Sequence, residues 1–367
     1  MPNVLICADS IRSPELRHEV PYAAPDAFVY AEQNGSRYVF IGSMEIPLVE
    51  EIAGLEAVPL DALGVDELIE QGLRWHELRR ELALRACRRL SLDDVVTPRD
   101  FPLDVADHLR ANGVQLRYDD ELFDRRRRVK TGAELAGIRR AQRGAERAMD
   151  AIRARLFAGG EVASEDLRAE AQRAFTEAGV VASDVIASHG EQSAIGHHPG
   201  SGPIREGEPV VVDIFPQDPE SGCFADMTRT FCVGEPPQEL VDYHGACKEA
   251  LERVYEAIRP GVTGAELFRI TSDVFAERGI RTRMYDKKPG EVLEEGFFHA
   301  LGHGVGLEVH EYPDLAENGV ELVAGDVVAV EPGAYRKGFG GCRLEDLVLV
   351  TEDGYERLTD FPYDLAP

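Results

Sequence analysis

The chain has 367 residues, more than one ordinary hydrophobic core accommodates, so its length predicts two domains. Hydrophobic residues make up 44% and charged residues 29%, which is typical of a globular protein and excludes a disordered one. The formal net charge at pH 7 is −27, which argues against nucleic acid or an anionic membrane as a partner, because phosphates would be repelled.

Six cysteines are scattered along the chain without a Cys-x-x-Cys pair, which indicates reduced, buried thiols of a cytosolic protein. Charged residues interrupt the N-terminal segment too early for a signal peptide. No apolar run approaches the roughly 18–20 residues that a membrane helix needs. The sequence therefore predicts a soluble, cytoplasmic protein.

The N-terminal third carries alternating strand and helix signals. Two strand-type runs flank Asn34-Gly35, the strongest short-range hairpin signal. Apolar residues recur at helical spacing over residues 63–90, and residues 93–119 read as strand, helix, strand. Because no cluster of acids or histidines recurs here, we predict a small α/β domain over residues 1–125 without chemistry of its own.

Four consecutive arginines, residues 125–128, end this part. We interpret them as a solvated linker with acidic neighbours rather than a nucleic-acid patch, because the chain as a whole is acidic. Thr131 and Glu134 then have capping-box spacing, and an apolar stripe at steps of three or four predicts a long helix. This helix would open a second domain, residues 126–367. The stripe consists of Leu135, Ile138, Ala141, Ala145, Met149, Ile152 and Leu156.

The second domain contains an internal duplication at an offset of 100 residues. Residues 160–180 and 260–280 each read as a loop followed by an amphipathic helix that a glycine closes. The aligned identities are Val162 with Val262, Leu167 with Leu267, Phe175 with Phe275, Glu177 with Glu277 and Gly179 with Gly279.

Each copy is followed by two strand-type runs that carry one acid each. VVVDIF and ADMTRTF hold Asp213 and Asp226, and VAVEPG and RLEDLVL hold Glu331 and Glu345, at similar spacings. We expect an antiparallel strand pair in each half, with its acids near the strand ends. If the halves pack about a pseudo-twofold axis, the four carboxylates converge. The second copy is longer, and its extra segment, GHGVGLEVH, includes His303.

Four converging carboxylates repel one another, and two divalent cations would cancel their charge. Bridging carboxylates hold such ions roughly 3.5–4 Å apart, the geometry of two-metal hydrolases. One imidazole among oxygen ligands suits manganese, cobalt, iron or zinc. The predicted metal ligands are Asp213, Asp226, His303, Glu331 and Glu345.

These motifs resemble those of the pita-bread metallopeptidases, a family that includes prolidase and X-Pro aminopeptidase. The resemblance runs from about residue 128 to 360 and rests on SAIGHH, VVVDIF, ADMTRTF, GHGVGLEVHEYP, VAVEPG and GGCRLEDLVLVTEDG. It implies an α+β protein, with a pita-bread catalytic domain of two duplicated halves around an antiparallel sheet. The first domain resembles the creatinase/prolidase N-terminal domain in position and size.

The resemblance also implies which of the two ions each metal ligand binds. Asp213 would bind one ion, and Asp226 and Glu345 would bridge two ions. His303 and Glu331 would complete the second site, and Glu331 would also help to move a proton.

Three further residues match positions of the family that contact the substrate. His197 and His310 correspond to histidines that touch the substrate and stabilise the transition state. Arg343 corresponds to an arginine that supports the acidic site and the substrate. None of the departures from the family pattern removes a ligand; they are Phe215 after the first acid, Gly196 before His197 and Cys342 before Arg343.

The function implied by the resemblance is hydrolysis of the X-Pro peptide bond, with a small peptide that has proline at its second position as substrate. We favour an X-Pro dipeptidase, and an X-Pro aminopeptidase acting on longer peptides is the alternative. A metal-free, creatinase-like amidinohydrolase and a non-catalytic binding scaffold are alternatives of a different class. The family also implies a homodimer.

Overall fold

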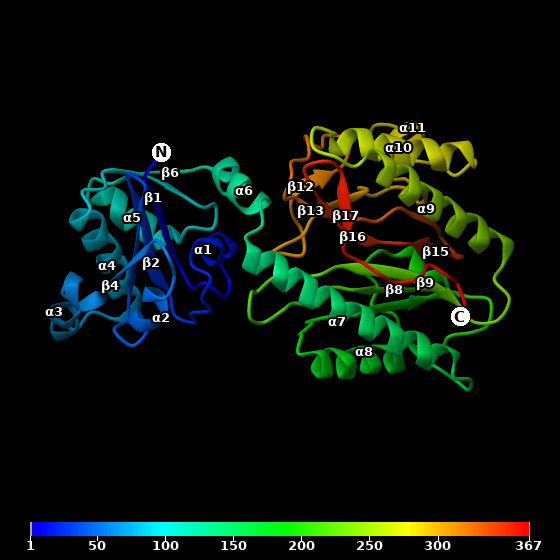
Figure 1. Cartoon of the computed structure of the whole chain (residues 1–367), viewed down its shortest axis with the longest axis horizontal. Helices are drawn as coiled ribbons and strands as arrows, with labels where there is room; N and C mark the ends of the chain where they lie inside the picture. Colours follow the sequence, from blue (N-terminus) through cyan, green and yellow to red (C-terminus); the bar gives the residue numbers. More distant parts are fainter. Residues whose placement is uncertain (1, 367) are drawn as a thin grey trace. The chain divides into compact units, whose positions relative to one another are not determined.

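A computed structural model describes residues 2–366 and divides the chain into two compact units, Met1–Arg127 and Arg128–Pro367 (Figure 1). Among the described residues, no helix combines the length and apolarity that crossing a membrane requires. All six cysteines are buried, and none of them forms a disulfide within the described chain.

The first unit is built on one mixed six-stranded sheet with helices packed on it. Its elements are β1 (Val4–Ala8), α1 (Pro14–Glu19), β2 (Phe28–Gln33), β3 (Ser36–Ile41), α2 (Ile46–Glu50), β4 (Leu55–Pro59), η1 (Leu60–Leu63), α3 (Val65–Glu70), α4 (Trp75–Arg89), β5 (Asp94–Thr97), α5 (Leu103–Ala111), β6 (Gln115–Tyr118) and α6 (Asp120–Arg128). The strand order is β4-β3-β2-β1-β5-β6. Alternate residues of β1 enter different apolar cores, Leu5 in one and Ile6 in the other, so the sheet is buried on both faces.

The predicted hairpin is confirmed, and residues 63–90 are mostly helical as predicted, although in more than one helix. Asn34 and Gly35 both have positive φ angles, 52° and 86°, as a tight turn between antiparallel β2 and β3 requires. The helical segment is divided into η1, α3 and α4. Gly72 lies in the break before α4 with φ 77°, a backbone conformation that a continuous helix does not contain.

The arginine run has the acidic neighbours that were predicted, but it is not a solvated linker, because Arg127 and Arg128 are buried. Residues 125–128 form the end of α6. Arg126 donates hydrogen bonds to the carboxylates of Glu19, at 2.8 Å, and Glu32, at 2.6 and 2.9 Å. Within the second unit, Arg128 is held in a forked contact by both oxygens of buried Asp326, at 2.8 and 2.6 Å. The sequence could not show these partners, because they lie far away along the chain.

The described part of the second unit contains three sheets, and α7 precedes them in the chain. Its elements are α7 (Gly132–Phe157), α8 (Ser164–Ala178), β7 (Ile186–His189), η2 (Gly190–Ala194), β8 (Pro209–Ile214), β9 (Met227–Cys232), α9 (Gln238–Ala257), α10 (Gly264–Glu277), α11 (Arg283–Asp286), β10 (Glu295–Gly296), β11 (Gly302–Gly304), β12 (Glu311–Leu315), β13 (Val327–Val330), β14 (Gly333–Arg336), β15 (Gly340–Arg343), β16 (Asp346–Val350) and β17 (Tyr355–Arg357). The predicted capping box of α7 is present, with Thr131 and Glu134 bonded reciprocally.

The duplicated segments form equivalent elements in the two halves. α8 and α10 begin 100 residues apart, and Gly179 and Gly279 follow their ends with the same φ of 73°. α7 and α8 pack on the sheet β7-β8-β9, whereas α9 and α10 cover the sheets of the other half (Figure 1). The two predicted strand pairs are both antiparallel, β8 with β9 and β13 with β16.

The two halves are joined directly behind the acidic strand ends. The backbone N–H of Glu345 donates to the carbonyl of Thr228 at 3.0 Å. The side chain of Thr230 accepts from the backbone N–H of Arg343 at 3.0 Å and donates to its carbonyl at 2.9 Å. These bonds fix the register between β9 and the β15–β16 segment, and therefore the relative position of the acids.

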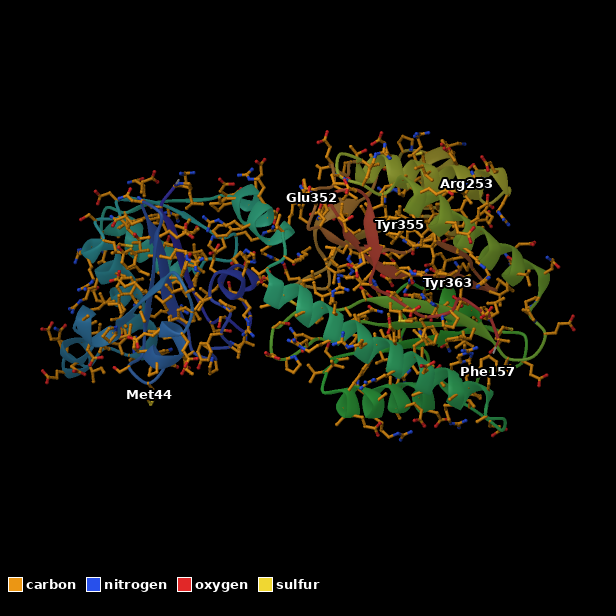
Figure 2. The ribbon with its side chains drawn as sticks, viewed as in Figure 1. Met44, Phe157, Arg253, Glu352, Tyr355 and Tyr363 are labelled. Carbon is orange, nitrogen blue, oxygen red and sulfur yellow. The ribbon has the colours of Figure 1, made fainter. Side chains whose placement is uncertain are left out.

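A buried ion pair lies next to this junction. Arg229 donates to Asp346 Oδ1 at 2.8 Å, and both side chains are almost fully excluded from water. The other oxygen of Asp346 accepts from the hydroxyls of Tyr255, at 2.7 Å, and Tyr363. Tyr355 stacks on Tyr255 at a ring-centroid distance of 5.4 Å, and Figure 2 labels Tyr355 and Tyr363 near the C-terminal strands. The network ties β9, β16, α9 and the C-terminal segment together.

Candidate metal centre

One cavity of about 490 Å³ in the second unit brings all the predicted site residues together. Its lining includes the predicted metal ligands Asp213, Asp226, His303, Glu331 and Glu345 and the predicted substrate-contacting residues His197, His310 and Arg343.

Strand ends position the four acids. Asp213 is the last residue but one of β8, and Asp226 directly precedes β9, so the β8–β9 pairing carries both to the same end. Glu331 directly follows β13, and Glu345 directly precedes β16, its antiparallel neighbour. The two strand pairs thus present equivalent acids to one space.

His303 reaches the acids from β11, which pairs with β13 in antiparallel register opposite Ala329. The glycines on either side of it are required by close packing. A Cβ atom at Gly302 would overlap the carbonyl oxygen of Ala329, and one at Gly304 would overlap that of Tyr312. The Gly-His-Gly sequence therefore lets a histidine-bearing strand lie unusually close to its neighbours.

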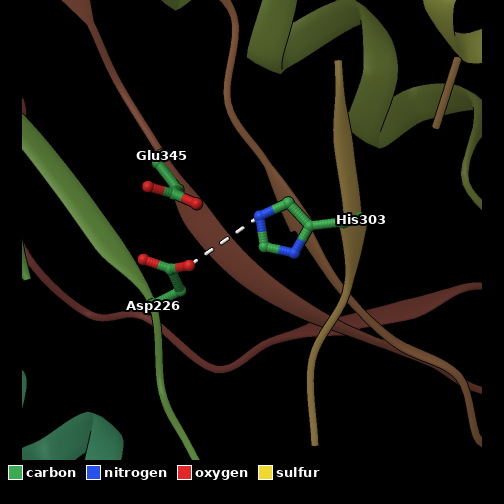
Figure 3. Close-up of side chains that lie close together, drawn as sticks. All are labelled: Asp226, His303 and Glu345. Carbon is green, nitrogen blue, oxygen red and sulfur yellow. Dashed lines mark ion pairs between the residues drawn. The ribbon is translucent and has the colours of Figure 1, made fainter. Parts of the chain in front are cut away.

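Three side chains of the cavity, Asp226, His303 and Glu345, lie close enough together to hold a metal ion (Figure 3). One ligand atom of each lies within 4.8 Å of the others. His303 Nε2 lies 3.8 Å from Asp226 Oδ2 and 3.7 Å from Glu331 Oε1. Imidazole nitrogen and carboxylate oxygens at this separation suit a divalent transition metal ion.

The tautomer of His303 fits a ligand role. Its Nδ1 lies 3.1 Å from the carbonyl oxygen of Gly304, which can only accept, so Nδ1 carries the proton. The lone pair of Nε2 then faces Asp226 and Glu331. Burial, followed by the neighbouring His310, lowers the pKa of His303 to about 4, which keeps the ring neutral. A neutral imidazole whose second nitrogen is held by a carbonyl is the usual form of a metal-binding histidine.

The carboxylates carry more charge than the protein groups around them neutralise. Burial and the negative charge of Glu345 raise the pKa of Asp226 well above its ordinary value, and burial and Glu345 act likewise on Glu331. Burial and Asp213 raise the pKa of Glu345 to about 7. The site therefore lacks positive charge unless cations bind there.

Asp213 supplies a further indication that the acidic cluster suits a cation. Its Oδ2 accepts a hydrogen bond from Arg343 at 2.6 Å, but its Oδ1 is buried and has no hydrogen-bond partner among the described residues. Buried carboxylate oxygens are almost always satisfied. The donor set and this oxygen together fit divalent metal ions.

Arg343 is the central support of the acidic cluster. It is buried, donates to the hydroxyls of Thr228 at 3.2 Å and Tyr335 at 3.1 Å, and lies 3.7 Å from Glu331. Thr228 in turn donates to Glu345 at 2.6 Å. One guanidinium group thus orients acids from both halves.

The two other predicted histidines, His197 and His310, also line the cavity. The His303 and His310 rings have a centroid distance of 4.2 Å. Partial desolvation, followed by the nearby His197, lowers the pKa of His310, so its neutral ring can donate a hydrogen bond. His197 itself is exposed and lines the same cavity.

Phe298, His299 and Tyr335 form an aromatic wall at one side of this cavity, which the sequence did not predict. The Phe298 and Tyr335 rings are 5.2 Å apart, and the Tyr335 hydroxyl lies 3.1 Å from His299 Nε2. The signals available were the FFH run just before Ala300 and the single tyrosine in GAYR. Neither has a spacing that distinguishes it from ordinary core residues. Three residues depart from the family pattern. Phe215 and Gly196 line the cavity, whereas Cys342 is buried outside its lining.

Comparison with known proteins decides the family. The sequence pattern of metallopeptidase family M24 matches residues 136–352, more than half of the chain. The chain belongs to metallopeptidase family M24. It is 33% identical over 344 residues to the probable dipeptidase PepE of Mycobacterium tuberculosis, with 86% of each chain covered. It is 32% identical over 252 residues to the Xaa-Pro dipeptidase of Pyrococcus furiosus, with 68% of each covered.

The structure of the Xaa-Pro dipeptidase from Bacillus anthracis superposes with a TM-score of 0.80 at 25% identity, covering 100% of this chain and 94% of that one. The M24 chain has the pita-bread fold and is a metallopeptidase. Its family uses divalent metal ions, which agrees with the donor set and the unsatisfied oxygen of Asp213. Because the family is a metallopeptidase family, the metal-free amidinohydrolase and the non-catalytic scaffold lose their support.

Proposed function

We propose that this M24 peptidase hydrolyses the bond between an N-terminal residue and a following proline, with dipeptides as its main substrates. The observation that carries the proposal is the aromatic wall beside the carboxylates. Phe298 and Tyr335 offer flat, apolar surfaces to a pyrrolidine ring. The ring of His299 lies next to them, with its centroid 5.5 Å from that of Tyr335. A cavity of about 490 Å³ is of the size that takes a small ligand.

Two divalent ions would be held by Asp213, Asp226, His303, Glu331 and Glu345. We propose manganese or cobalt, because four carboxylates and one imidazole give mostly hard oxygen ligands. When bound, such ions acidify water and polarise the scissile carbonyl group.

The residues of this chain supply the remaining steps. Glu331 would take a proton from the attacking water and deliver it to the proline nitrogen as the peptide bond breaks. His310 and His197 are proposed to donate hydrogen bonds to the oxygen of the scissile carbonyl, on which negative charge develops. Arg343 keeps Asp213 oriented throughout.

The proposal also covers the two domains, the cellular location and the oligomeric state. We infer that residues 1–125 are a creatinase/prolidase-like N-terminal domain and residues 126–367 the catalytic domain. The enzyme is proposed to work as a cytoplasmic homodimer on small peptides.

A peptide panel tests the proposal. Ala-Pro, Ala-Pro-Ala and Met-Ala are incubated with the enzyme and Mn(II) or Co(II), and the released amino acids are quantified. We expect Ala-Pro to be hydrolysed at least about a hundredfold faster than Met-Ala, because the alanine at the second position of Met-Ala makes less contact with the aromatic wall than proline does. Faster release from Met-Ala than from Ala-Pro would refute X-Pro specificity.

A further inference from the structure

His310 lies at the end of a loop that connects two strands of the catalytic sheet. The loop, residues 305–310, joins β11 to β12, and His310 is its last residue and is exposed. Backbone hydrogen bonds hold the beginning of the loop. The N–H of Val305 donates to the carbonyl of Val327 at 2.9 Å, and the carbonyl of Gly306 accepts from the N–H of Phe224 at 2.8 Å. These two bonds fix the beginning of the loop and leave its end to other contacts.

A buried ion pair holds the end of the loop. Glu311 directly follows His310 and pairs with Lys130, which lies just before α7. Both side chains of the pair are only 4% exposed. Successive side chains of an extended segment point to opposite sides. Glu311 can therefore face Lys130 while His310 lines the cavity.

The ion pair also packs against the backbone of the loop. A Cβ atom at Gly306 would lie 2.5 Å from Glu311 Oε1 and 2.7 Å from Lys130 Nζ. Both distances are too short for an ordinary contact, so a larger residue at position 306 would displace the pair. The glycine leaves the space that the ammonium and carboxylate groups occupy.

The segment that carries Lys130 is itself held firmly. Arg128 donates to both oxygens of buried Asp326, at 2.8 and 2.6 Å. Its guanidinium carbon also lies over the ring of Tyr312, 5.0 Å from the ring centroid. Residues 128 and 130 thus contact the two residues that follow His310. Asp326 directly precedes β13, the strand paired with β11, so this anchor has a fixed position relative to the metal-ligand strands.

We propose that Lys130 is a positioning residue for His310. Through Glu311 it holds the imidazole ring where the ring can donate a hydrogen bond to the developing oxyanion. The inference rests on the role that the proposed function gives to His310, and extends it to a residue outside the described cavity lining. A buried ion pair adds little net stability, because desolvation of the two charges offsets their attraction. Its main contribution is therefore to the geometry of the loop end.

A double-mutant cycle between Lys130→Met and His310→Ala tests this role. The full-length, Mn(II)-loaded enzyme is used, and kcat and KM are measured for Ala-Pro. Lys130→Met should lower kcat about 10- to 100-fold with KM changed less than about twofold, because a misplaced donor is missed mainly in the transition state. In the His310→Ala background the same substitution should change kcat less than about twofold, since the imidazole is already gone. A merely structural role would lower kcat by the same factor in both backgrounds.

Two further variants separate positioning from folding. Lys130→Met leaves Glu311 buried without its counter-charge, which can prevent folding. Lys130→Met/Glu311→Gln removes both charges at once, so it should melt close to the wild-type temperature and still show the loss of kcat. Lys248→Met, at an exposed position on α9, is the matched control and should keep the wild-type kcat. Metal content, measured by elemental analysis, should be unchanged in all these variants.

The outcomes distinguish the inference from the proposed function. Equal losses of kcat in the two backgrounds overturn the inference, and so does a wild-type kcat in Lys130→Met/Glu311→Gln. In both cases the wild-type enzyme still hydrolyses Ala-Pro, so the proposed function stands. Failure of the wild-type enzyme to hydrolyse Ala-Pro overturns the proposed function, and the inference falls with it.

Discussion

Arg343 Nη2 donates to Asp213 Oδ2 at 2.6 Å, while the other oxygen of Asp213 is buried without a hydrogen-bond partner among the described residues. The guanidinium group thus fixes one half of the carboxylate and leaves the other half free to bind a cation. A carboxylate that is held in this way is already oriented for metal binding before the ion binds.

Arg343→Lys should therefore damage the site while keeping its charge. A lysine cannot reach Asp213, Thr228 and Tyr335 at once, because its ammonium group is not a planar fork. We expect kcat/KM on Ala-Pro to fall about 10- to 100-fold, with weaker metal binding. Arg336→Lys, at a partly exposed pair with Glu239 outside the cavity lining, is the control and should retain activity. Equal activity of the two variants would show that Arg343 has no orienting role.

Removing the metal should make stability depend on pH. The ordinary pKa of Glu345, 4.5, rises to about 7 in the metal-free fold, so between these values the folded state binds a proton that the unfolded state has released. The free energy of unfolding therefore falls as pH rises through this window, by on the order of 3 kcal/mol from Glu345 alone. Chelated protein should melt at a lower temperature at pH 8 than at pH 5, and added Mn(II) should stabilise it most at pH 8. Glu345→Gln should reduce this pH dependence.

His310→Ala should separate catalysis from metal binding. His310 contacts His303 but is not a predicted ligand, and its proposed task is a hydrogen bond to the developing oxyanion. Losing one such donor costs about 10²- to 10³-fold in kcat. Metal content, measured by elemental analysis, should stay unchanged. His198→Ala is the matched control, because His198 Nδ1 accepts from the backbone N–H of Gly200 instead of facing the acids. Loss of metal from His310→Ala would contradict the assignment.

The ion pair behind the site should matter for stability. Asp346→Asn leaves Arg229 buried without its full counter-charge, which costs about 3–5 kcal/mol in comparable pairs. Urea denaturation of the second unit should show this loss. Arg139→Gln breaks the exposed pair with Glu356, and its cost should not exceed about 1 kcal/mol. Similar urea midpoints for the two variants would contradict the expectation that the buried ion pair contributes more to stability than the exposed one.

The acids and His303 could be predicted from sequence because each follows from a local pattern repeated in two halves. Asp213 and Glu331 end apolar runs, Asp226 and Glu345 begin them, and the strands pair as the spacing suggests. Local patterns are enough where a residue's position is set by the strand that carries it.

Contacts between distant segments could not be predicted in this way. Tyr335 and His299 approach each other only because β14 packs beside the segment before β11. The partners of Arg126 likewise lie on α1 and β2, about a hundred residues earlier. Composition suggested a solvated arginine run, whereas folding brings buried acids to it. Such pairings depend on tertiary packing and leave no periodic signal in the chain.

The central claim is that five side chains from the two halves hold two cations that hydrolysis requires. The most direct measurement titrates chelated protein with Mn(II) by calorimetry and follows Ala-Pro hydrolysis in the same samples. We predict binding of about two ions per chain, with activity rising as they bind, and loss of both in Glu345→Gln. Full hydrolysis by the chelated protein, or unchanged binding and activity in Glu345→Gln, would contradict the account.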